Sequence, residues 1–170
     1  MASTSSNCPL SHNPQGINHL KLRLELDYLY VNLLEYFKAN YARFSNCDKP
    51  NIILFEQQLE NGRPDLLKNL RQNCHGLDLQ KLLHLMIKFS KYMADCRPLE
   101  EEMWKNEAAT LEYLLDLRNM LAHAIRVEVP DDSYLLIFKK IESLADIYEF
   151  PQERLNEIDT LTCPCLQKKE

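Results

Sequence analysis

Glycine is scarce in this sequence. The 170 residues include only three glycines, and no segment fits the glycine-rich patterns GxxxxGK or GxGxxG. Loops of those kinds cradle nucleotide phosphates with their backbone amides. A β-sandwich would also need many short loops rich in turn residues. The scarcity therefore argues against a conventional nucleotide-hydrolysing enzyme and against a turn-rich β fold.

Long hydrophobic runs are absent as well. No segment approaches the ~20 apolar residues of a membrane-spanning helix. The first sixteen residues, MASTSSNCPLSHNPQG, contain no apolar stretch of the kind found in a signal peptide. We therefore expect a soluble protein of the cytoplasm or nucleus that has no membrane partner. Its six cysteines are expected to be reduced.

Basic residues are concentrated in the middle of the chain. The net charge is −5, yet residues 63–97 carry seven basic and three acidic side chains. Residues 98–170 carry eight basic and sixteen acidic side chains. Because the net charge of the chain is negative, the chain as a whole repels nucleic acid. The basic middle third is therefore the expected binding surface for an anionic partner.

Hydrophobic residues recur at helical spacing along most of the chain. The pattern predicts a disordered tail over 1–16, a helical domain over 17–158 and a flexible tail over 159–170. The first helix is expected over 17–44, although the stretch HLKLRLEL also alternates as a strand does. We find no internal repeat and no convincing strand pair. The expected fold is an all-α, single-domain bundle of about five to seven helices.

Further helices are expected after the first, separated by short polar breaks. They cover residues 51–60, 64–73, 79–94 and 99–124, the segment DDSYLLIFKKIESLADIYEF, and the short stretch PQERLNEI. Aspartate accepts hydrogen bonds from the free amides of a first turn. Asp78 is therefore the expected N-cap of the helix over 79–94, and Asp131 or Asp132 that of the helix that follows them.

The predicted helix over 79–94 carries a basic stripe. Its members recur at spacings of three and four and therefore share one side of the helix. They are Lys81, His84, Lys88 and Lys91. Such a stripe can follow a phosphate backbone, although it is more often a solvated face. We take these residues as a candidate RNA-binding surface.

An arginine, an amide and an imidazole lie close together in LRNMLAHA, residues 117–124. Such side chains cost free energy when they are buried without partners, so they are exposed, paired or used. On a helix, one polar stripe would run beside Arg118. It comprises Glu112, Asp116, Asn119 and His123. Asp116 or Asn119 could orient the imidazole or the guanidinium, while a solvated face with an Arg–Asp pair explains the same spacing.

The segment LRNMLAH resembles the signature of the HEPN superfamily (higher eukaryotes and prokaryotes nucleotide-binding). In that signature an arginine and a polar residue precede a histidine by a few positions, and here Arg118 and Asn119 are followed by His123 after three residues. The wider frame LLDLRNMLAHAIRVEVPDDSYLLIFKKIESLADI resembles the branch also found in endonucleases of nuclear mRNA quality control. The resemblance covers roughly residues 99–150, and the upstream helices match only as a generic bundle.

This resemblance implies a helical bundle that dimerises and brings two copies of the motif into one cleft. In active members such a cleft cuts RNA without a metal ion. His123 would transfer protons at the ribose 2′-hydroxyl and the leaving oxygen, Arg118 would stabilise the developing charge, and Asn119 would position the phosphate or the histidine. Asp116 has no secure role in the family pattern and is kept as an orienting candidate.

Two functions remain open at this point. The first is a metal-independent endoribonuclease that cleaves single-stranded RNA as a homodimer. The second is a non-catalytic HEPN module that dimerises or binds a nucleotide or RNA; a purely structural helical domain would leave the motif unexplained. The expected partners are RNA, a second copy of the chain, and a larger parent or regulatory protein. No cofactor or metal is expected. Zinc at Cys163 and Cys165 would need two further ligands, which Cys74 and His75 could supply, but nothing in the sequence places the two segments together.

Overall fold

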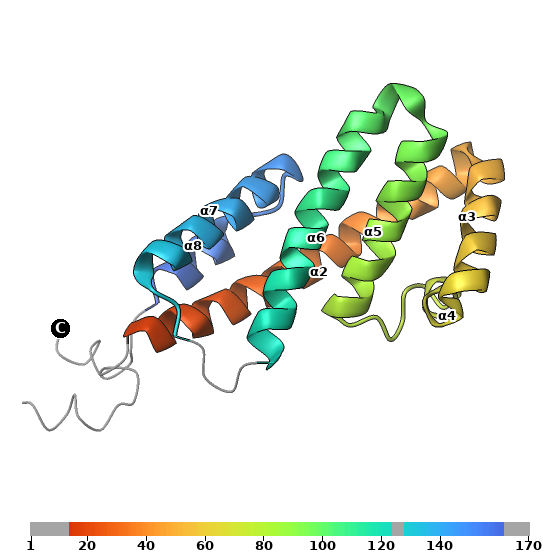
Figure 1. Cartoon of the computed structure of the whole chain (residues 1–170). Helices are drawn as coiled ribbons and strands as arrows, with labels where there is room; N and C mark the ends of the chain where they lie inside the picture. The colour runs from red at the N-terminus through yellow and green to blue at the C-terminus, as the bar shows by residue number, and fades with distance from the viewer. Residues whose placement is uncertain (1–13, 124–127, 162–170) are drawn as a thin grey trace, which may run out of the picture. The chain divides into compact units, whose positions relative to one another are not determined.

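The computed structural model describes residues 14–123 and 128–161. These ranges contain seven α-helices, one short 3-10 helix and no strand (Figure 1). The elements are α2 (Pro14–Cys47), α3 (Lys49–Gly62), α4 (Pro64–Arg71), α5 (Leu79–Cys96), η2 (Pro98–Glu100), α6 (Glu101–His123), α7 (Asp131–Ile147) and α8 (Glu153–Asp159). The expected all-α bundle of five to seven helices is confirmed.

The described chain divides into two compact units. The larger unit is Tyr30–Asn119, and the other combines the described residues up to Leu29 with those from Met120 onward. The predicted single domain with two tails stays a prediction, because most of both tails lies outside the described residues. None of the helices in 14–123 and 128–161 is long and apolar enough to cross a membrane.

Phe89 lies at the centre of the core of the Tyr30–Asn119 unit. Its ring centroid is 5.2 Å from that of Phe55 and 5.9 Å from that of Trp104, both in edge-to-face geometry. Phe37 of α2 makes a third edge-to-face contact at 5.8 Å. Such pairs contribute ~0.5–1.5 kcal/mol beyond the area that they bury. Through this aromatic cluster, α2, α3, α5 and α6 pack against one another.

Both ends of α5 are fixed by side-chain contacts. Asp78 is its N-cap as predicted, and the carboxylate accepts a hydrogen bond from the Lys81 amide at 2.8 Å. At the other end, the Arg97 guanidinium pairs with Asp48 at 3.1 Å and also with Glu100. α6 then runs antiparallel to α5 (Figure 1). This hairpin carries the candidate site residues of the unit.

The buried faces of α5 and α6 follow the predicted spacing. The side chains of Leu82, Leu83, Met86 and Phe89 on α5 and of Trp104, Ala108 and Leu111 on α6 are buried. Leu79 and Leu115, which recur at the same helical spacing, are half-buried.

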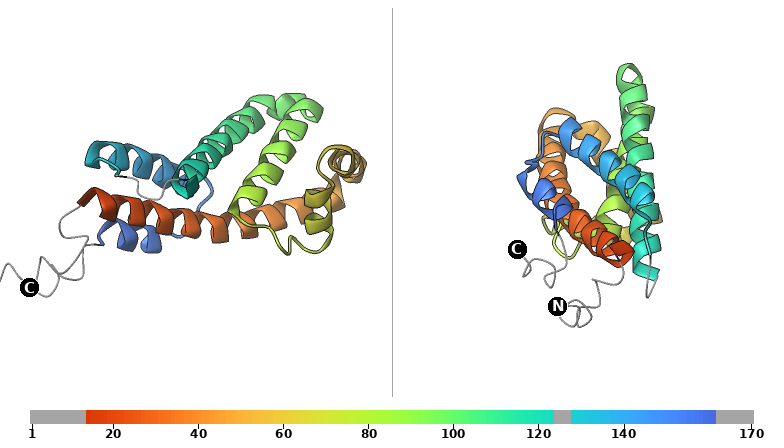
Figure 2. Two further views of the ribbon diagram at one scale, coloured as in Figure 1. Left: turned by 60° about the horizontal axis from the view of Figure 1, so that its bottom comes forward. Right: turned by 90° about the vertical axis from the view of Figure 1, so that its left-hand side faces the viewer.

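The second unit contains α7 and α8, which pack against the first turns of α2 (Figure 2), and the last four residues of α6. The prediction that Asp131 or Asp132 caps α7 is wrong. Pro130 is the N-cap, with the fixed φ and extended ψ that suit this position, so both aspartates fall inside the first turn. There, carboxylates still interact favourably with the helix dipole. The Asp131 carboxylate also accepts a hydrogen bond from Asn18 of α2 at 2.7 Å.

Candidate functional site

The residues of the motif lie in the last two turns of α6. Arg118 and Asn119 are the last two residues of the Tyr30–Asn119 unit. His123 is the last residue of α6 and belongs to the other unit. Residues four apart share one side of an α-helix, as Asn119 and His123 do. Arg118 is turned from Asn119 by about 100°, the rotation per residue.

Arg118 is half-buried and hydrogen-bonded to two neutral amides. Its Nη1 donates to Gln80 Oε1 at 3.4 Å and to Asn119 Oδ1 at 3.3 Å. Gln80 lies in the first turn of α5, so the guanidinium bridges the two helices of the hairpin. Among the described residues, no carboxylate forms an ion pair with Arg118. Its positive charge is therefore not neutralised by a described partner.

His123 and Asp116 are both exposed. Asp116 makes no hydrogen bond or ion pair with another described residue. The Arg–Asp pair that the spacing allowed is thus not formed, and Arg118 is oriented by Asn119 and Gln80. Residues 124–127, which follow His123, lie outside the described ranges.

Glu112, at the start of the polar stripe of α6, contacts the basic stripe of α5. Its carboxylate pairs with Lys91 Nζ at 2.7 Å, and the two side chains are 46% and 63% exposed. Exposed ion pairs contribute only about 0–1 kcal/mol. The pair therefore adds little stability, but it shows that the two stripes lie side by side at this point of the hairpin.

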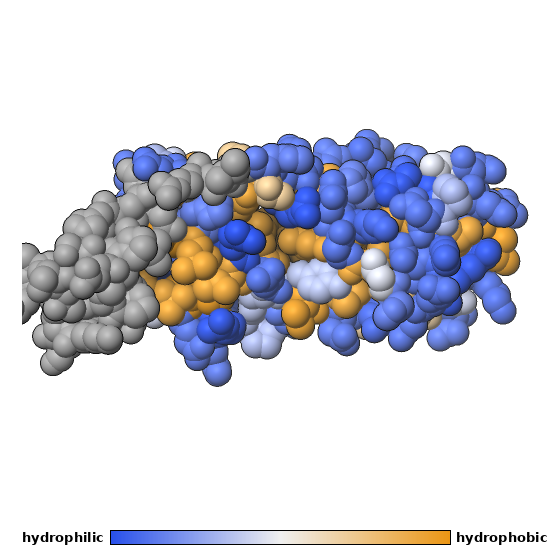
Figure 3. Space-filling model, turned by 90° about the horizontal axis from the view of Figure 1, so that it is seen from below, coloured by the Kyte–Doolittle hydropathy of each residue, from blue (hydrophilic) through white to orange (hydrophobic). Residues whose placement is uncertain are grey.

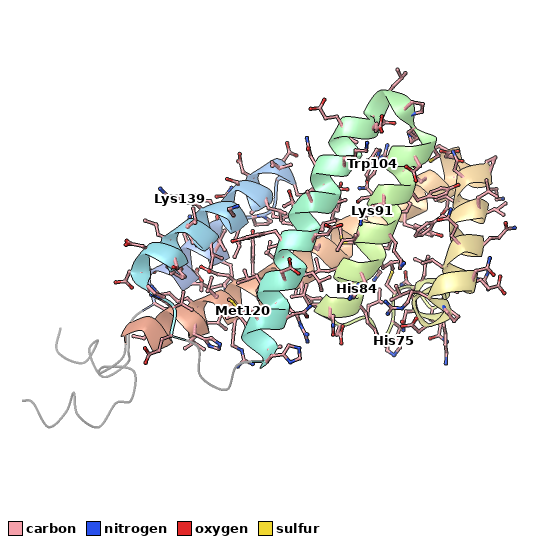
Figure 4. All side chains as sticks on the ribbon, in the orientation of Figure 1. His75, His84, Lys91, Trp104, Met120 and Lys139 are labelled. Carbon is pink, nitrogen blue, oxygen red and sulfur yellow. The ribbon has the colours of Figure 1, made fainter. Side chains whose placement is uncertain are left out.

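The residues of the basic stripe differ in burial. Lys81 and His84 are half-buried, whereas Lys88 and Lys91 are exposed; Figure 4 shows His84 and Lys91 on α5. Burial lowers the pKa of His84 from its ordinary value of 6.5, and the nearby charges of Arg63 and Lys88 lower this pKa further. Asp65 and Asp78 raise this pKa in opposition, so charges of both signs surround the imidazole.

A groove of about 240 Å³ lies between α3 and α5. Arg63, Lys88 and Lys91 supply its positive charges, Asp95 a negative one, and Tyr92 an aromatic ring. Sequence analysis missed Arg63 and Tyr92 as members of this surface. Tyr92 follows Lys88 by four residues and so shares its side of the helix, a signal that was available. Arg63 joins the surface only through the packing of α3 against α5.

A second groove of about 440 Å³ lies between α5 and α6. Two cations, Lys91 and Lys105, and two anions, Asp95 and Glu112, line it together with three alanines. Lys105 is paired with Glu101 at 2.6 Å. Because the charges of the two signs balance, this groove selects no charged ligand.

Metal ligands do not cluster in the described ranges, where no three His, Cys, Asp or Glu side chains gather in a suitable arrangement. Cys163 and Cys165, the pair considered for zinc, lie outside those ranges. Cys74 is buried, and burial raises the pKa of its thiol. Since metals bind the thiolate, a raised pKa disfavours Cys74 as a ligand.

Comparison of the chain with protein-family models, with curated proteins and with solved structures found no match. The resemblance to the HEPN superfamily therefore depends on the segment LRNMLAH and the frame around it.

Proposed function

We propose that the chain is a HEPN-type, metal-independent endoribonuclease that cleaves single-stranded RNA as a homodimer. One observation carries this proposal: Arg118 is held by the amides of Gln80 and Asn119 and by no described carboxylate. A guanidinium oriented by neutral groups keeps its full charge for a phosphate, which an Arg–Asp pair would not allow. An exposed His123 follows it on the same helix.

The proposed reaction uses the nucleophile that RNA itself carries. His123 of one copy accepts the proton of the ribose 2′-hydroxyl as that oxygen attacks the adjacent phosphorus. The bond to the 5′-oxygen breaks, and His123 of the second copy donates a proton to the leaving oxygen. Arg118 stabilises the added negative charge on the phosphorane, and Asn119 keeps the guanidinium oriented. The products are a 2′,3′-cyclic phosphate and a 5′-hydroxyl.

A contact between two copies is proposed at Met120. This side chain follows Asn119 directly and is 49% exposed (Figure 4). Apolar patches also reach the surface elsewhere, as Figure 3 shows for one face. A symmetric contact places the same patch of both copies together. With Met120 at its centre, the contact would bring the two motifs close to each other.

Cleavage of RNA in the presence of EDTA tests the proposal. The native chain is expected to cut single-stranded RNA and to leave 2′,3′-cyclic phosphate ends, while DNA of the same sequence stays intact because it lacks the 2′-hydroxyl. His123→Ala is expected to abolish cleavage. His75→Ala, which changes another exposed histidine, is the matched control and is expected to retain activity. RNA that remains intact with the native chain would contradict the enzyme.

A non-catalytic HEPN module that dimerises or binds RNA is the second candidate. Exposed apolar side chains on α7 favour it: Leu135, Leu136 and Ile147 are 50%, 60% and 76% exposed. Such residues suit a contact surface better than a solvated one. RNA binding or dimerisation without cleavage would select this candidate. The cytoplasmic or nuclear location and the larger parent or regulatory protein stay predictions.

A further inference from the structure

We propose that the groove between α3 and α5 binds one nucleotide unit of a single-stranded RNA, with the phosphate on Arg63, Lys88 and Lys91 and the base on the ring of Tyr92. The groove contains none of the motif residues. The choice of RNA as ligand rests on the proposed function, whereas the binding of a phosphate beside a planar base rests on the groove itself.

The size of the groove fits a single unit of a longer chain. Its volume is about 240 Å³. Pockets for whole drug-sized ligands measure roughly 300–1,000 Å³ and enclose most of the ligand. The groove is partly open to solvent, which allows the rest of a strand to continue outside it.

The cations of the groove are available to a phosphate. Lys88 is exposed and makes no ion pair with a described residue. Arg63 donates two hydrogen bonds of 3.0 Å to the Asp65 carboxylate, and this contact lowers the pKa of Asp65 to about 2. Lys91 pairs with Glu112 through a single contact between two exposed side chains. An exposed single-contact pair such as Lys91–Glu112 contributes only about 0–1 kcal/mol, whereas the two-point contact of Arg63 with Asp65 is stronger. The phosphodiester of RNA carries one negative charge over its two non-bridging oxygens. It can bind Lys88 directly, displace Glu112 from Lys91, and share Arg63 with Asp65.

Tyr92 supplies the aromatic surface of the groove. Its side chain is half-buried, and its ring is backed by Phe55, whose centroid lies 5.7 Å away and which is 1% exposed. This backing fixes the ring, so a base that stacks on it need not first order it. Burial raises the pKa of the Tyr92 hydroxyl, which therefore stays protonated and uncharged beside a phosphate. Aromatic stacking accepts every base and gives affinity without sequence preference.

His84 reports on the charge in the groove. Burial and the charges of Arg63 and Lys88 lower the pKa of His84. The carboxylates of Asp65 and Asp78 raise it, but by less. A bound phosphate offsets the two cations and must raise this pKa. RNA binding should therefore take up a proton at His84. Affinity should increase as the pH falls from the raised pKa of the complex towards the pKa of the free chain, which lies below 6.5.

Fluorescence anisotropy with a labelled six-nucleotide RNA tests the site. The full chain is used with the change His123→Ala, so that the RNA is not cut during the measurement. Lys88→Gln is expected to weaken binding about fourfold at physiological salt, which is the effect of losing one single-strand phosphate contact with a salt slope of about 0.7. Tyr92→Leu is expected to weaken it about tenfold, whereas Tyr92→Phe keeps the stacking surface and most of the affinity.

Lys139→Gln is the matched control, because Lys139 is an exposed lysine of α7 in the other unit. Unchanged affinity in both Lys88→Gln and Tyr92→Leu would overturn the site, even if the native chain cuts RNA. Loss of affinity in both variants, with no cleavage by the native chain, would support the site and contradict the nuclease. Inorganic phosphate that binds as tightly as the RNA would overturn the contact with the base. A mononucleotide that binds more tightly than the hexanucleotide would overturn a strand of RNA as the ligand.

NMR titration of the His84 imidazole gives an independent readout, with His84→Gln used to assign its signal. The pKa of His84 is expected to rise when RNA is added, and to rise in free Lys88→Gln because one of the two nearby cations is removed. If added RNA leaves this pKa unchanged, the phosphate does not lie at Arg63 and Lys88, and the proposal is wrong.

Discussion

Glu25 is a carboxyl group with no exposed surface. The Tyr134 hydroxyl lies 2.9 Å from its Oε2 and 2.8 Å from Oδ1 of Asp159. A hydroxyl has one hydrogen and can donate to only one of the two carboxyl groups. A protonated Glu25 resolves this conflict, because it can donate to the Tyr134 oxygen while Tyr134 donates to Asp159. Burial, opposed in part by the hydrogen bond from Tyr134, raises the pKa of Glu25 to about 8.

This raised pKa predicts that stability falls as the pH rises. Between the ordinary value of 4.5 and about 8, the folded chain binds a proton at Glu25 that the unfolded chain has lost. The free energy of unfolding should therefore decrease across this window, by up to about 1.4 kcal/mol per pH unit. Below pH 4.5 this contribution is fully retained, and above 8 it is fully lost.

Urea unfolding at pH values from 5 to 9 measures this effect. Glu25→Gln stays neutral at every pH and is expected to flatten the pH dependence. Glu128→Gln, which changes an exposed glutamate of the same unit, is expected to leave the dependence as it is in the native chain. Equal pH dependence in native chain and Glu25→Gln would show that Glu25 is ionised when folded.

At the scale of elements, the α5–α6 hairpin determines what Arg118 can do. The guanidinium contacts Gln80 across the hairpin, and that contact keeps it oriented without neutralising it. A carboxylate at position 80 would form an ion pair at nearly the same distance. The charge offered to a phosphate would then be reduced although Arg118 itself is unchanged.

Gln80→Glu is therefore expected to slow RNA cleavage by about tenfold, a fraction of the ~10²–10³ lost when a donor to a developing oxyanion is removed. Gln80→Met, which cannot form an ion pair, should retain more activity than Gln80→Glu. Single-turnover cleavage at saturating protein measures the difference in the chemical step. A Gln80→Glu chain as active as the native one would mean that Arg118 does not contact the scissile phosphate.

Helix positions could be predicted because each helix buries one face and so leaves a period in the sequence. Asp78 could be predicted as an N-cap because aspartate is favoured at that position and here stands directly before a segment of helical periodicity. The cap of α7 was misassigned because Pro130 can hold the N-cap conformation without a side-chain hydrogen bond. The groove between α3 and α5 could not be predicted, since no sequence spacing indicates that Arg63 packs near Lys88.

The candidate site, too, could be predicted within one helix but not in its contacts between helices. The spacing of Arg118, Asn119 and His123 places them in two turns of one helix, as found. The sequence did not indicate that Gln80 holds the guanidinium, because that contact joins residues 38 positions apart. Nor did the sequence exclude an Arg–Asp pair, which only the direction of the side chains decides.

At the scale of the whole molecule, the proposed activity requires two chains. The mass of one chain is 20.0 kDa. Light scattering at micromolar concentration is expected to show about twice this mass. Met120→Lys places a charge at the proposed contact and is expected to give monomers that have lost cleavage. Met103→Lys is the matched control, because Met103 is a similarly exposed methionine of α6, at 54%. A native chain that stays monomeric would contradict a composite site.

The chain has a single tryptophan, Trp104, which is 4% exposed in the aromatic cluster of the Tyr30–Asn119 unit. Its ring lies against those of Phe89 and Phe44. Indole emission therefore reports the melting of this unit alone, without any label. Backbone circular dichroism records the helices of both units together. A difference between the two melting curves would reveal whether the halves of the molecule unfold in one step or in two.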